Sequence, residues 1–299
     1  MKRPVIRSGV VLAVTFVLAA CGGERSQQRA GGGEGERSRP ITIRGSDTMV
    51  ILGQRFAEEY MKQNPGVVIQ VNGGGSGTGI AALINGTTDL AQSSRPMRDN
   101  EKENVEKRRN AKLTETPVAL DALAVFVNEA NPVQALTIDQ LAQIYTGKVT
   151  NWSQLGAPSA PIVLYGRENS SGTYEYFKEH VLAKADFAPR TQTLQGTAAV
   201  INAVSRDRNG IGYGGIAYAQ GVRSVGVKVD AGSPAVQPAE ENVANGTYPI
   251  ARKLFFYWVD TGKPEIEQFV QWAVSPEGQK VVENVGYFPL SDTPQAAAR

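Results

Sequence analysis

From residue 41 onward, short apolar segments alternate along the chain with longer and more polar segments. The apolar segments predict strands at 41–43, 67–71, 89–91, 117–127, 162–164, 211–213 and 254–259. The intervening segments, most of them amphipathic, predict helices at 48–63, 80–85, 98–110, 137–145, 174–181, 197–204 and 264–273. Strands that alternate with helices favour an α/β fold with largely parallel sheets, in which ligands bind at the carboxyl ends of the strands.

The first residues follow a different pattern, which predicts a signal peptide at 1–20. Three basic residues come first, and an apolar run of 12 residues from Gly9 to Ala20 follows. A membrane-spanning helix needs ~20 apolar residues, so this run is typical of a secretory signal. Cys21 follows Leu-Ala-Ala and resembles the lipidation site of bacterial lipoproteins. We therefore expect an exported protein, periplasmic or on the cell surface, that is held at a membrane by a lipid on Cys21.

The segment after the cysteine predicts a lipidated flexible tether at 21–39. Residues 22–39 contain no large apolar side chain. Such a segment cannot bury enough surface to offset the entropy cost of becoming ordered. The folded body is therefore expected to begin near residue 40.

Composition and charge exclude several classes of function. The chain has 299 residues, 31 of them basic and 29 acidic, and loss of the signal peptide leaves 28 basic and 29 acidic residues. This balance argues against a nucleic-acid partner and requires any anion site to arise from local arrangement. One cysteine excludes an internal disulfide, and one histidine disfavours His-rich metal sites and most Ser-His-Asp triads. We expect no metal, no cofactor and no enzymatic activity.

Four polar segments lie where predicted strands give way to helices. They are residues 45–48, 73–79, 93–95 and 167–173, and each combines backbone N–H groups near a helix start with hydroxyl side chains. A helix N-terminus carries unpaired N–H groups and a partial positive charge, which favours an anion. Arg95 and Arg167 add planar guanidinium groups that suit a tetrahedral oxyanion. Together the segments predict an anion site built from several loops.

The glycine-rich loop at 73–79 does not match the common nucleotide-binding motifs. Counting from Gly73 or Gly75, the last position of G-x-G-x-x-G falls on Thr78 or Ile80, and no lysine follows as the P-loop requires. Nucleotide binding is therefore not supported.

The order of these motifs resembles the phosphate-binding lipoproteins of bacterial phosphate ABC transporters, the PstS family. The resemblance runs from GSDTMVILGQRF through GGGSGTGI, ALDALAVFVN and GRENSSGTYEYF to SPEGQKVVENVGYFPL, which covers nearly all of residues 40–291. It implies a two-lobed periplasmic-binding-protein fold of type II, with mixed sheets, helices on both faces and two hinge crossings. The crossings are expected near 119–127 and 246–255. Lobe 1 would combine 40–120 with 250–291, lobe 2 would be 121–249, and 292–299 would form a tail.

The resemblance also implies which residues contact phosphate. They are Thr48 (with Asp47 as the neighbouring candidate), Ser76, Ser94, Arg167, Ser171, Gly172 and Thr173. The sequence departs from the family pattern at two places, because Ser94 and Asn169 stand where well-studied members carry aspartate. The first aspartate accepts the proton of the phosphate and the second partners the binding arginine.

The missing proton acceptor matters because phosphate near neutral pH retains an O–H, whereas sulfate has none. A carboxylate left unpaired beside sulfate opposes its binding. Asp121, an acid within the apolar segment at the expected crossing, is our candidate for this acceptor. The alternative is a hinge carboxylate that binds backbone N–H groups or Arg95. Arg95 in turn is expected either to touch phosphate or to hold Asp121.

The resulting expectation is a monomeric protein that binds inorganic phosphate outside the cytoplasmic membrane and delivers it to the permease subunits of an ABC transporter. One alternative is a receptor for sulfate, molybdate or another oxyanion. A second is a secreted hydrolase or phosphatase that uses Ser76, which lacks a suitable base nearby in the sequence. A third is an adhesion or signalling lipoprotein that does not transport.

Overall fold

A computed structural model describes residues 39–290 of the chain. The predicted signal peptide, Cys21, the tether up to residue 38 and the tail at 292–299 lie outside the described residues. Within 39–290, none of the helices has the length and apolarity that a membrane crossing requires.

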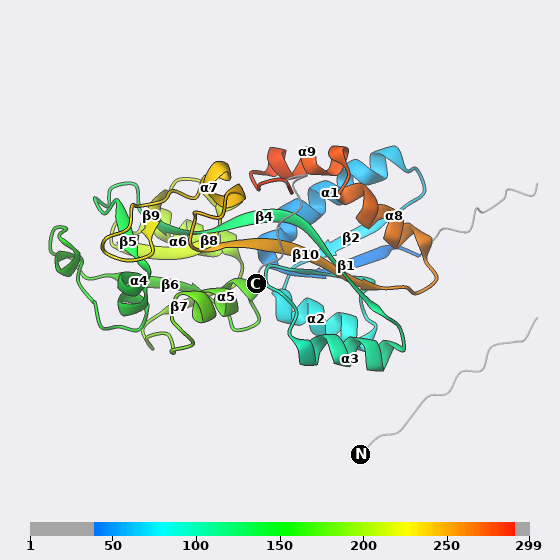
Figure 1. Cartoon of the computed structure of the whole chain (residues 1–299), viewed down its shortest axis with the longest axis horizontal. Helices are drawn as coiled ribbons and strands as arrows, with labels where there is room; N and C mark the ends of the chain where they lie inside the picture. The colour runs from blue at the N-terminus through cyan, green and yellow to red at the C-terminus, as the bar shows by residue number, and fades with distance from the viewer. Residues whose placement is uncertain (1–38, 291–299) are drawn as a thin grey trace, which may run out of the picture. The chain divides into compact units, whose positions relative to one another are not determined.

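The described chain alternates between strands and helices, as the sequence predicts (Figure 1). The strands are β1 (Ile41–Gly45), β2 (Ile69–Asn72), β3 (Leu90–Ser93), β4 (Leu113–Val127), β5 (Ala135–Thr137), β6 (Val163–Arg167), β7 (Gln192–Leu194), β8 (Gly210–Gly215), β9 (Arg223–Lys228) and β10 (Ala251–Val259). The helices are α1 (Val50–Gln63), α2 (Ser76–Asn85), α3 (Asp99–Arg109), α4 (Ile138–Tyr145), α5 (Gly172–His180), α6 (Thr197–Arg206), α7 (Glu240–Ala244), α8 (Pro264–Ala273) and α9 (Pro276–Val285). Short 3-10 helices are η1 (Asp47–Met49), η2 (Trp152–Leu155) and η3 (Ile216–Tyr218).

The strands form one continuous mixed sheet in the order β2-β1-β3-β10-β4-β8-β6-β7, and β9 pairs with β4 and β5. The pairs β1–β2, β1–β3, β6–β7 and β6–β8 are parallel. The central pairs β3–β10, β10–β4 and β4–β8 are antiparallel. The prediction of largely parallel sheets therefore holds toward the two ends. The antiparallel pairs in the middle make the sheet mixed, as the family resemblance implies.

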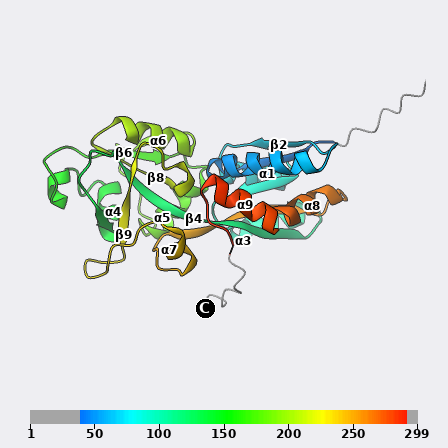
Figure 2. The same ribbon diagram turned by 90° about the horizontal axis from the view of Figure 1, so that it is seen from above.

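The apolar core divides into two parts. The first core is built from β1, β3 and β10, with α1, α8 and α9 on one face and α2 and α3 on the other (Figure 1). The second core is built from β6 and β8, with α4 and α5 on one face and α6 on the other. Along β4, Ala119 packs in the first core and Leu120 in the second. Figure 2 shows β4 passing between the two bodies that these cores form.

The C-terminal segment also reaches from one core to the other. Tyr287 packs in the first core, whereas Phe288 packs against the second core and pairs with Leu120 on β4. The Tyr287 hydroxyl donates a hydrogen bond of 2.6 Å to the carbonyl oxygen of Thr48. The segment after α9 thus runs beside β4 and supports the turn that follows β1.

The glycine-rich loop differs from its prediction, because α2 begins at Ser76 and not at Ile80. Gly74 and Gly75 have φ angles of 112° and 92°, which only glycine adopts readily, and they turn the chain sharply into the helix. Gly79 lies within α2, and a Cβ at this position would overlap the backbone of β1 at Arg44. Glycine at position 79 therefore lets the helix pack closely on the strand.

Several short elements have no counterpart among the predicted ones. β5, β7, β9 and α7 contain three to six residues each, which is too short for a clear periodic pattern. α9 is longer and was missed despite clear signals in the sequence, since Ser275 caps it, Pro276 begins it and Gly286 ends it.

Candidate functional site

Five hydroxyl side chains from separate loops meet in the interior of the molecule. We call Thr48, Ser76, Ser94, Thr173 and Thr197 the hydroxyl cluster. All five are buried, with at most 1% of each residue exposed. The first three belong to elements of the first core and the last two to elements of the second core, so the cluster lies where the two parts of the protein face one another.

The hydroxyl oxygens are close enough to form hydrogen bonds across this boundary. Thr48 Oγ1 lies 2.8 Å from Thr173 Oγ1 and 3.4 Å from Thr197 Oγ1. Ser94 Oγ lies 3.4 Å from Ser76 Oγ and 3.5 Å from Thr173 Oγ1. Since each hydroxyl can donate one proton, the cluster gathers several donors around one point.

In the first core, each hydroxyl is positioned by the end of a parallel strand. Thr48 lies in η1, directly after β1, and Ser76 is the first residue of α2, after β2. Ser94 follows β3, and its backbone N–H donates to Ser76 Oγ at 3.1 Å. Three neighbouring strands therefore bring the three side chains to one edge of the sheet, as the parallel arrangement requires.

In the second core, the predicted site residues surround the start of α5. Ser171 is the N-cap, and its Oγ accepts hydrogen bonds from the backbone N–H groups of Thr173 and Tyr174. A Cβ on Gly172 would overlap Ser76 Oγ and lie 3.0 Å from Ser94 Oγ. The glycine therefore lets the start of α5 approach the first core closely.

Arg167, the last residue of β6, directs its guanidinium into the cluster. Its NH1 donates to Thr197 Oγ1 at 2.9 Å, and its NH2 donates to Asp47 Oδ2 at 3.0 Å and to Glu168 Oε1 at 2.8 Å. Asn169 stands where well-studied members carry the aspartate partner of this arginine, and here Asp47 and Glu168 pair with Arg167 instead.

Asp47 precedes α1 and does not cap this helix. Its Oδ1 instead accepts a hydrogen bond of 2.9 Å from the backbone N–H of Gly74, and its Oδ2 faces Arg167. The N-cap position of α1 makes no side-chain hydrogen bond. Asp47 therefore ties the glycine-rich loop to the arginine of the other core.

Arg252, which the sequence interpretation missed, is a second buried arginine beside the cluster. Its NH2 donates to Thr173 Oγ1 at 3.0 Å, and its NH1 donates to the carbonyl oxygen of Ser94 at 3.0 Å. Its Nε donates to Asp121 Oδ2 at 2.8 Å, and Asp121 Oδ1 accepts from the backbone N–H of Ile216 at 3.1 Å. A basic residue at the start of a strong apolar strand was the available sequence signal.

Asp121 is fully buried, and burial raises the pKa of its carboxyl, while the Arg252 guanidinium opposes that rise. The expectation that Arg95 holds Asp121 is wrong, because Arg252 and the Ile216 N–H occupy both carboxylate oxygens.

Arg95 lies outside the hydroxyl cluster, although its position next to Ser94 made it a candidate. Its NH1 and NH2 each donate to a carboxylate oxygen of Glu101 at 2.8 Å, and its Nε lies 2.6 Å from Glu175 Oε2. Arg98 NH2 also pairs with Glu175 at 2.7 Å. The guanidinium of Arg95 is thus directed at two carboxylates, and the structure brings it to neither the cluster nor Asp121.

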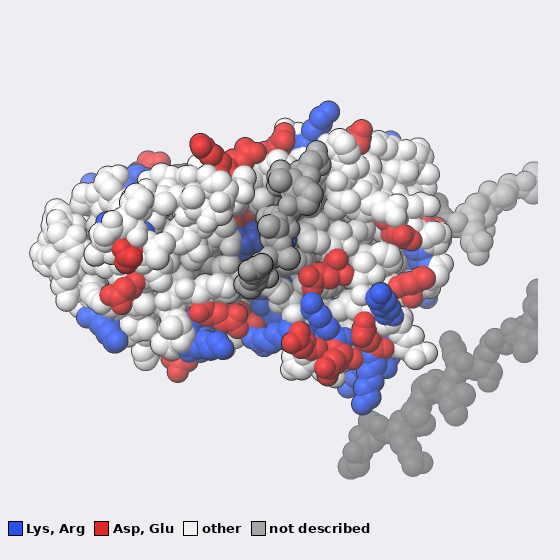
Figure 3. All heavy atoms as spheres, viewed as in Figure 1, with Lys and Arg blue, Asp and Glu red and all other residues white. Residues whose placement is uncertain are grey.

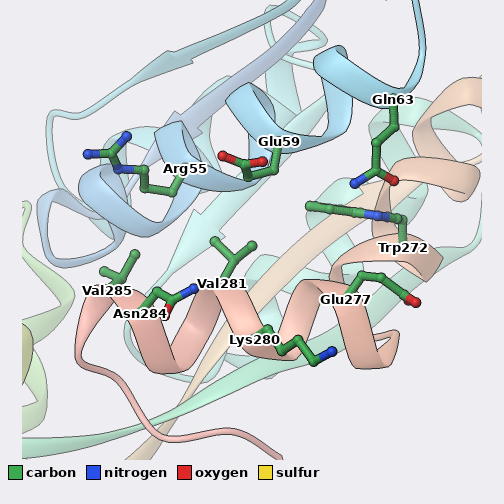
Figure 4. A pocket seen from close by; sticks show the side chains of 9 residues that line it. All are labelled: Arg55, Glu59, Gln63, Trp272, Glu277, Lys280, Val281, Asn284 and Val285. Atoms are coloured by element: carbon green, nitrogen blue, oxygen red, sulfur yellow. The ribbon is translucent and has the colours of Figure 1, made fainter.

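Charges of both signs lie side by side over α3 and its surroundings on the face in Figure 3. A groove of about 470 Å³ lies between α1 and α9 and is lined by Arg55, Glu59, Gln63, Trp272, Glu277, Lys280, Val281, Asn284 and Val285 (Figure 4). None of the predicted site residues lines this groove. The donors that converge therefore lie in the interior, in keeping with an anion site made by local arrangement.

Comparison with protein families gives a match to the model described as a PBP superfamily domain over residues 26–277. The chain is 37% identical over 308 residues to the phosphate-binding protein PstS of Pseudomonas aeruginosa, which covers 94% of each chain. It is 30% identical to the phosphate-binding protein PstS of Bacillus subtilis, with 97% of this chain and 95% of that protein covered. Both relatives are named for binding phosphate, and neither name states a reaction.

Among solved structures, a phosphate-bound substrate-binding protein of a putative phosphate ABC transporter from Clostridium perfringens matches with a TM-score of 0.77. The match has 30% identity and covers 85% of this chain and 100% of that one. An ABC-type phosphate transport receptor from Vibrio cholerae matches with a TM-score of 0.69 and 29% identity, over 84% and 100% of the two chains. The fold is thus the two-lobed α/β fold of these binding proteins.

Proposed function

The chain belongs to the PBP superfamily and, within it, to the PstS phosphate-binding proteins, and from this membership we propose that it binds inorganic phosphate for import by an ABC transporter. Phosphate is a small tetrahedral anion, and the hydroxyl cluster with its arginines offers the donors that such an anion requires. The chain then acts as the receptor that captures the anion, and the permease subunits carry it across the membrane.

The observation that carries this proposal is the contact between Thr48 and Thr173, whose hydroxyl oxygens lie 2.8 Å apart and come from opposite cores. Residues that the family resemblance assigns to phosphate lie 125 positions apart in the sequence, yet they meet in one buried place. Hydrogen bonds to a charged group contribute ~1.5–3 kcal/mol each. Six of them are enough for micromolar affinity, which corresponds to ~8 kcal/mol, after the costs of association.

We further propose that the two cores are the two lobes, 40–120 with 250–291 and 121–249, and that they open and close about β4 and β10. Hydroxyl groups in mutual contact must separate to admit an anion and can close around it afterwards. Closure excludes water from the site and gives the loaded receptor a shape that a permease can distinguish.

The proposal includes export by the signal peptide at 1–20 and attachment to a membrane through a lipid on Cys21. The permease subunits are the proposed partners, and the body is proposed to act as a monomer. These parts rest on the sequence and on the family. Export places the receptor on the side of the membrane where phosphate is scarce, and a lipid keeps it near its transporter.

Calorimetric titration of the protein without its signal peptide tests the proposal. One phosphate per chain should bind with micromolar or tighter affinity, and arsenate should compete because it has the same shape and protonation. Absence of binding at millimolar phosphate would reject the function. Growth of a deletion strain at low phosphate distinguishes transport from an adhesive or signalling role, which would leave growth unchanged.

A further inference from the structure

Arg252 and Asp121 stand on the two strands that pass between the cores. They are directly opposite one another in the pairing of β10 with β4. Their side chains are 1% and 0% exposed, and Arg252 NH2 lies 2.8 Å from Asp121 Oδ2. A charged pair this deeply buried is costly unless further hydrogen bonds satisfy both groups, so the additional partners of each group indicate its role.

The two edges of the Arg252 guanidinium face different groups. The edge formed by Nε and NH2 binds Asp121. The other edge, formed by NH1 and NH2, reaches Ser94 in the first core and Thr173 in the second. Asp121 has both oxygens engaged, by Arg252 and by the Ile216 N–H. Asp121 therefore holds one edge, and the other edge donates to the hydroxyl of Thr173 in the cluster and to the backbone carbonyl oxygen of Ser94.

Arg252 also determines which way a hydroxyl proton points. Thr173 Oγ1 accepts from Arg252 NH2, so the proton of Thr173 is directed away from the arginine and toward Thr48 or Ser94. Arg167 NH1 donates to Thr197 Oγ1 and orients the proton of that hydroxyl in the same way. Each arginine thus turns one threonine into a donor that faces the middle of the cluster.

An aromatic neighbour, Tyr176, adds a further contact to the Arg252 guanidinium. The Tyr176 ring lies 5.5 Å from the guanidinium carbon, and its hydroxyl donates to the carbonyl oxygen of Ala251 at 2.6 Å. His180 stacks on Tyr176, with ring centroids 3.8 Å apart. The ring thus packs against both His180 and the arginine, and it adds a cation–π contact to the hydrogen bonds that hold Arg252.

We propose that Arg252 is a second anion-binding residue of this site, carried by the strand β10 close to the boundary between the two lobes, and that Asp121 positions it and does not accept a ligand proton. The inference rests on the proposed phosphate-binding function. It replaces the expectation that Asp121 takes over the role of the missing aspartate at position 94. Because the arginine bridges Ser94 and Thr173, it contacts the anion at the place where the two lobes meet.

The test measures the dissociation constants for phosphate and sulfate in four variants, beside their thermal stability. Arg252→Gln should weaken phosphate binding ~10- to 100-fold, the loss expected for hydrogen bonds to a charged group. Because this change leaves Asp121 buried without its cation, the double variant D121N/R252Q, with two neutral amides, is measured as well. Phosphate binding by a folded double variant within threefold of the unchanged protein would overturn the role of Arg252.

Asp121→Asn separates the two roles considered for the carboxylate. If Asp121 positions Arg252, the affinities for phosphate and sulfate change by the same factor, and their ratio stays within threefold of that of the unchanged protein. If Asp121 accepts the phosphate proton, sulfate gains on phosphate by tenfold or more, which would overturn the inference.

The matched control is Arg223→Gln. Arg223 is a partly buried arginine of the second core whose NH2 donates to the carbonyl oxygens of Asn131 and Val133, away from the cluster. The affinity of the Arg223→Gln variant for both anions should be unchanged. Failure of the unchanged protein to bind phosphate would count against the proposed function itself. If the unchanged protein binds phosphate and D121N/R252Q binds it equally well, only the role of Arg252 is rejected.

Discussion

Two buried arginines, Arg95 and Arg252, show how similar chemistry acquires different roles. Both are at most 5% exposed as whole residues, and both pair with buried or half-buried carboxylates. Arg95 donates to Glu101 through NH1 and NH2 and faces Glu175 through Nε, so all three nitrogens of its guanidinium have a carboxylate partner. Arg252 meets one carboxylate, Asp121, and turns its remaining N–H groups toward Thr173 and Ser94. The two arginines therefore differ in what their remaining N–H groups face, and only those of Arg252 reach the hydroxyl cluster.

The difference follows from where each arginine stands in the fold. Arg95 lies just after the end of β3 and is drawn toward α3 and α5, whose acidic residues lie near its guanidinium. Arg252 lies on a crossing strand, with Asp121 as its directly paired neighbour. A role in anion binding therefore cannot be assigned from residue type and closeness in sequence to a site loop.

Arg167→Gln is expected to have the largest effect, and it extends the comparison to the arginine that the family resemblance assigns to phosphate. The change removes the donor that orients Thr197 and leaves Asp47 and Glu168 near the anion without their cation. Phosphate affinity should fall ~100-fold or more, measured by calorimetry. A loss of phosphate affinity under threefold would mean that Arg167, like Arg95, stabilises the fold and does not contact the anion.

Gly172→Ala tests whether the close approach of the lobes is needed for binding. A Cβ at this position would overlap Ser76 Oγ, so α5 must move away from the first core. We expect ~10-fold weaker phosphate binding with the melting temperature little changed, because each lobe retains its own core. The control is Gly232→Ala, where a Cβ meets Asp230 Oδ1 at an ordinary 3.5 Å. Equal affinities for the two variants would contradict the closed arrangement.

Arg95→Gln is expected to affect stability and spare affinity. The change leaves Glu101 and Glu175 half-buried without their main cation, which should lower the free energy of unfolding by about 1–3 kcal/mol. Denaturant unfolding measures this loss, and phosphate titration should give a dissociation constant within threefold of the unchanged protein. Should the affinity fall tenfold at unchanged stability, the contrast between the two arginines disappears.

The smallest expected effect is on the free energy of unfolding and concerns the ion pair of Asp89 with Lys263 near the surface. This pair gives a reference for the buried ion pairs of the two arginines. Asp89 accepts from Lys263 Nζ at 2.8 Å and from Thr42. Burial alone would raise the pKa of Asp89, but these hydrogen bonds outweigh it and hold the pKa below its usual value. The carboxylate thus stabilises the fold above the pKa it has in the unfolded chain, and this contribution is lost as the pH falls through its lower folded pKa.

Asp89→Asn should therefore be less stable than the unchanged protein at neutral pH, by under about 1 kcal/mol. The difference should shrink as the solution is made strongly acidic. Thermal unfolding between neutral pH and pH ~3 measures it. A difference that grows toward acid would reverse the sign and contradict this account.

Much of the fold can be predicted from the sequence, because long periodic segments decide it locally. The helix over 264–273 was predicted with the bounds that α8 has, and the charged run at 98–110 forms α3. β5 and β7 could not be predicted, since three residues carry no period and these strands exist through pairing with distant ones. The start of α2 was misplaced because glycine has a low helix propensity, which close packing on β1 overrides here.

Parts of the site could be predicted where a single loop at a strand end supplies the hydroxyl groups or the arginine. The convergence of Thr48, Ser76, Ser94 and Thr173 follows from parallel strand ends and from the family resemblance. The roles of Asp47 and Arg252 depend on pairings that span 120 and 131 positions, and these appear only once the sheet is assembled. Thr197 was missed because a threonine after a glycine at a helix start is a common capping pattern.

The hydrogen bond from Tyr287 to the carbonyl oxygen of Thr48 has a consequence for biosynthesis. Thr48 belongs to the first turn made after the first strand, yet the partner of its carbonyl oxygen lies 239 positions later in the chain. A nascent chain therefore lacks this hydrogen bond until residue 287 has been synthesised, as does any product that stops earlier. The turn after β1 gains this support only after every helix and strand of the described residues has been made.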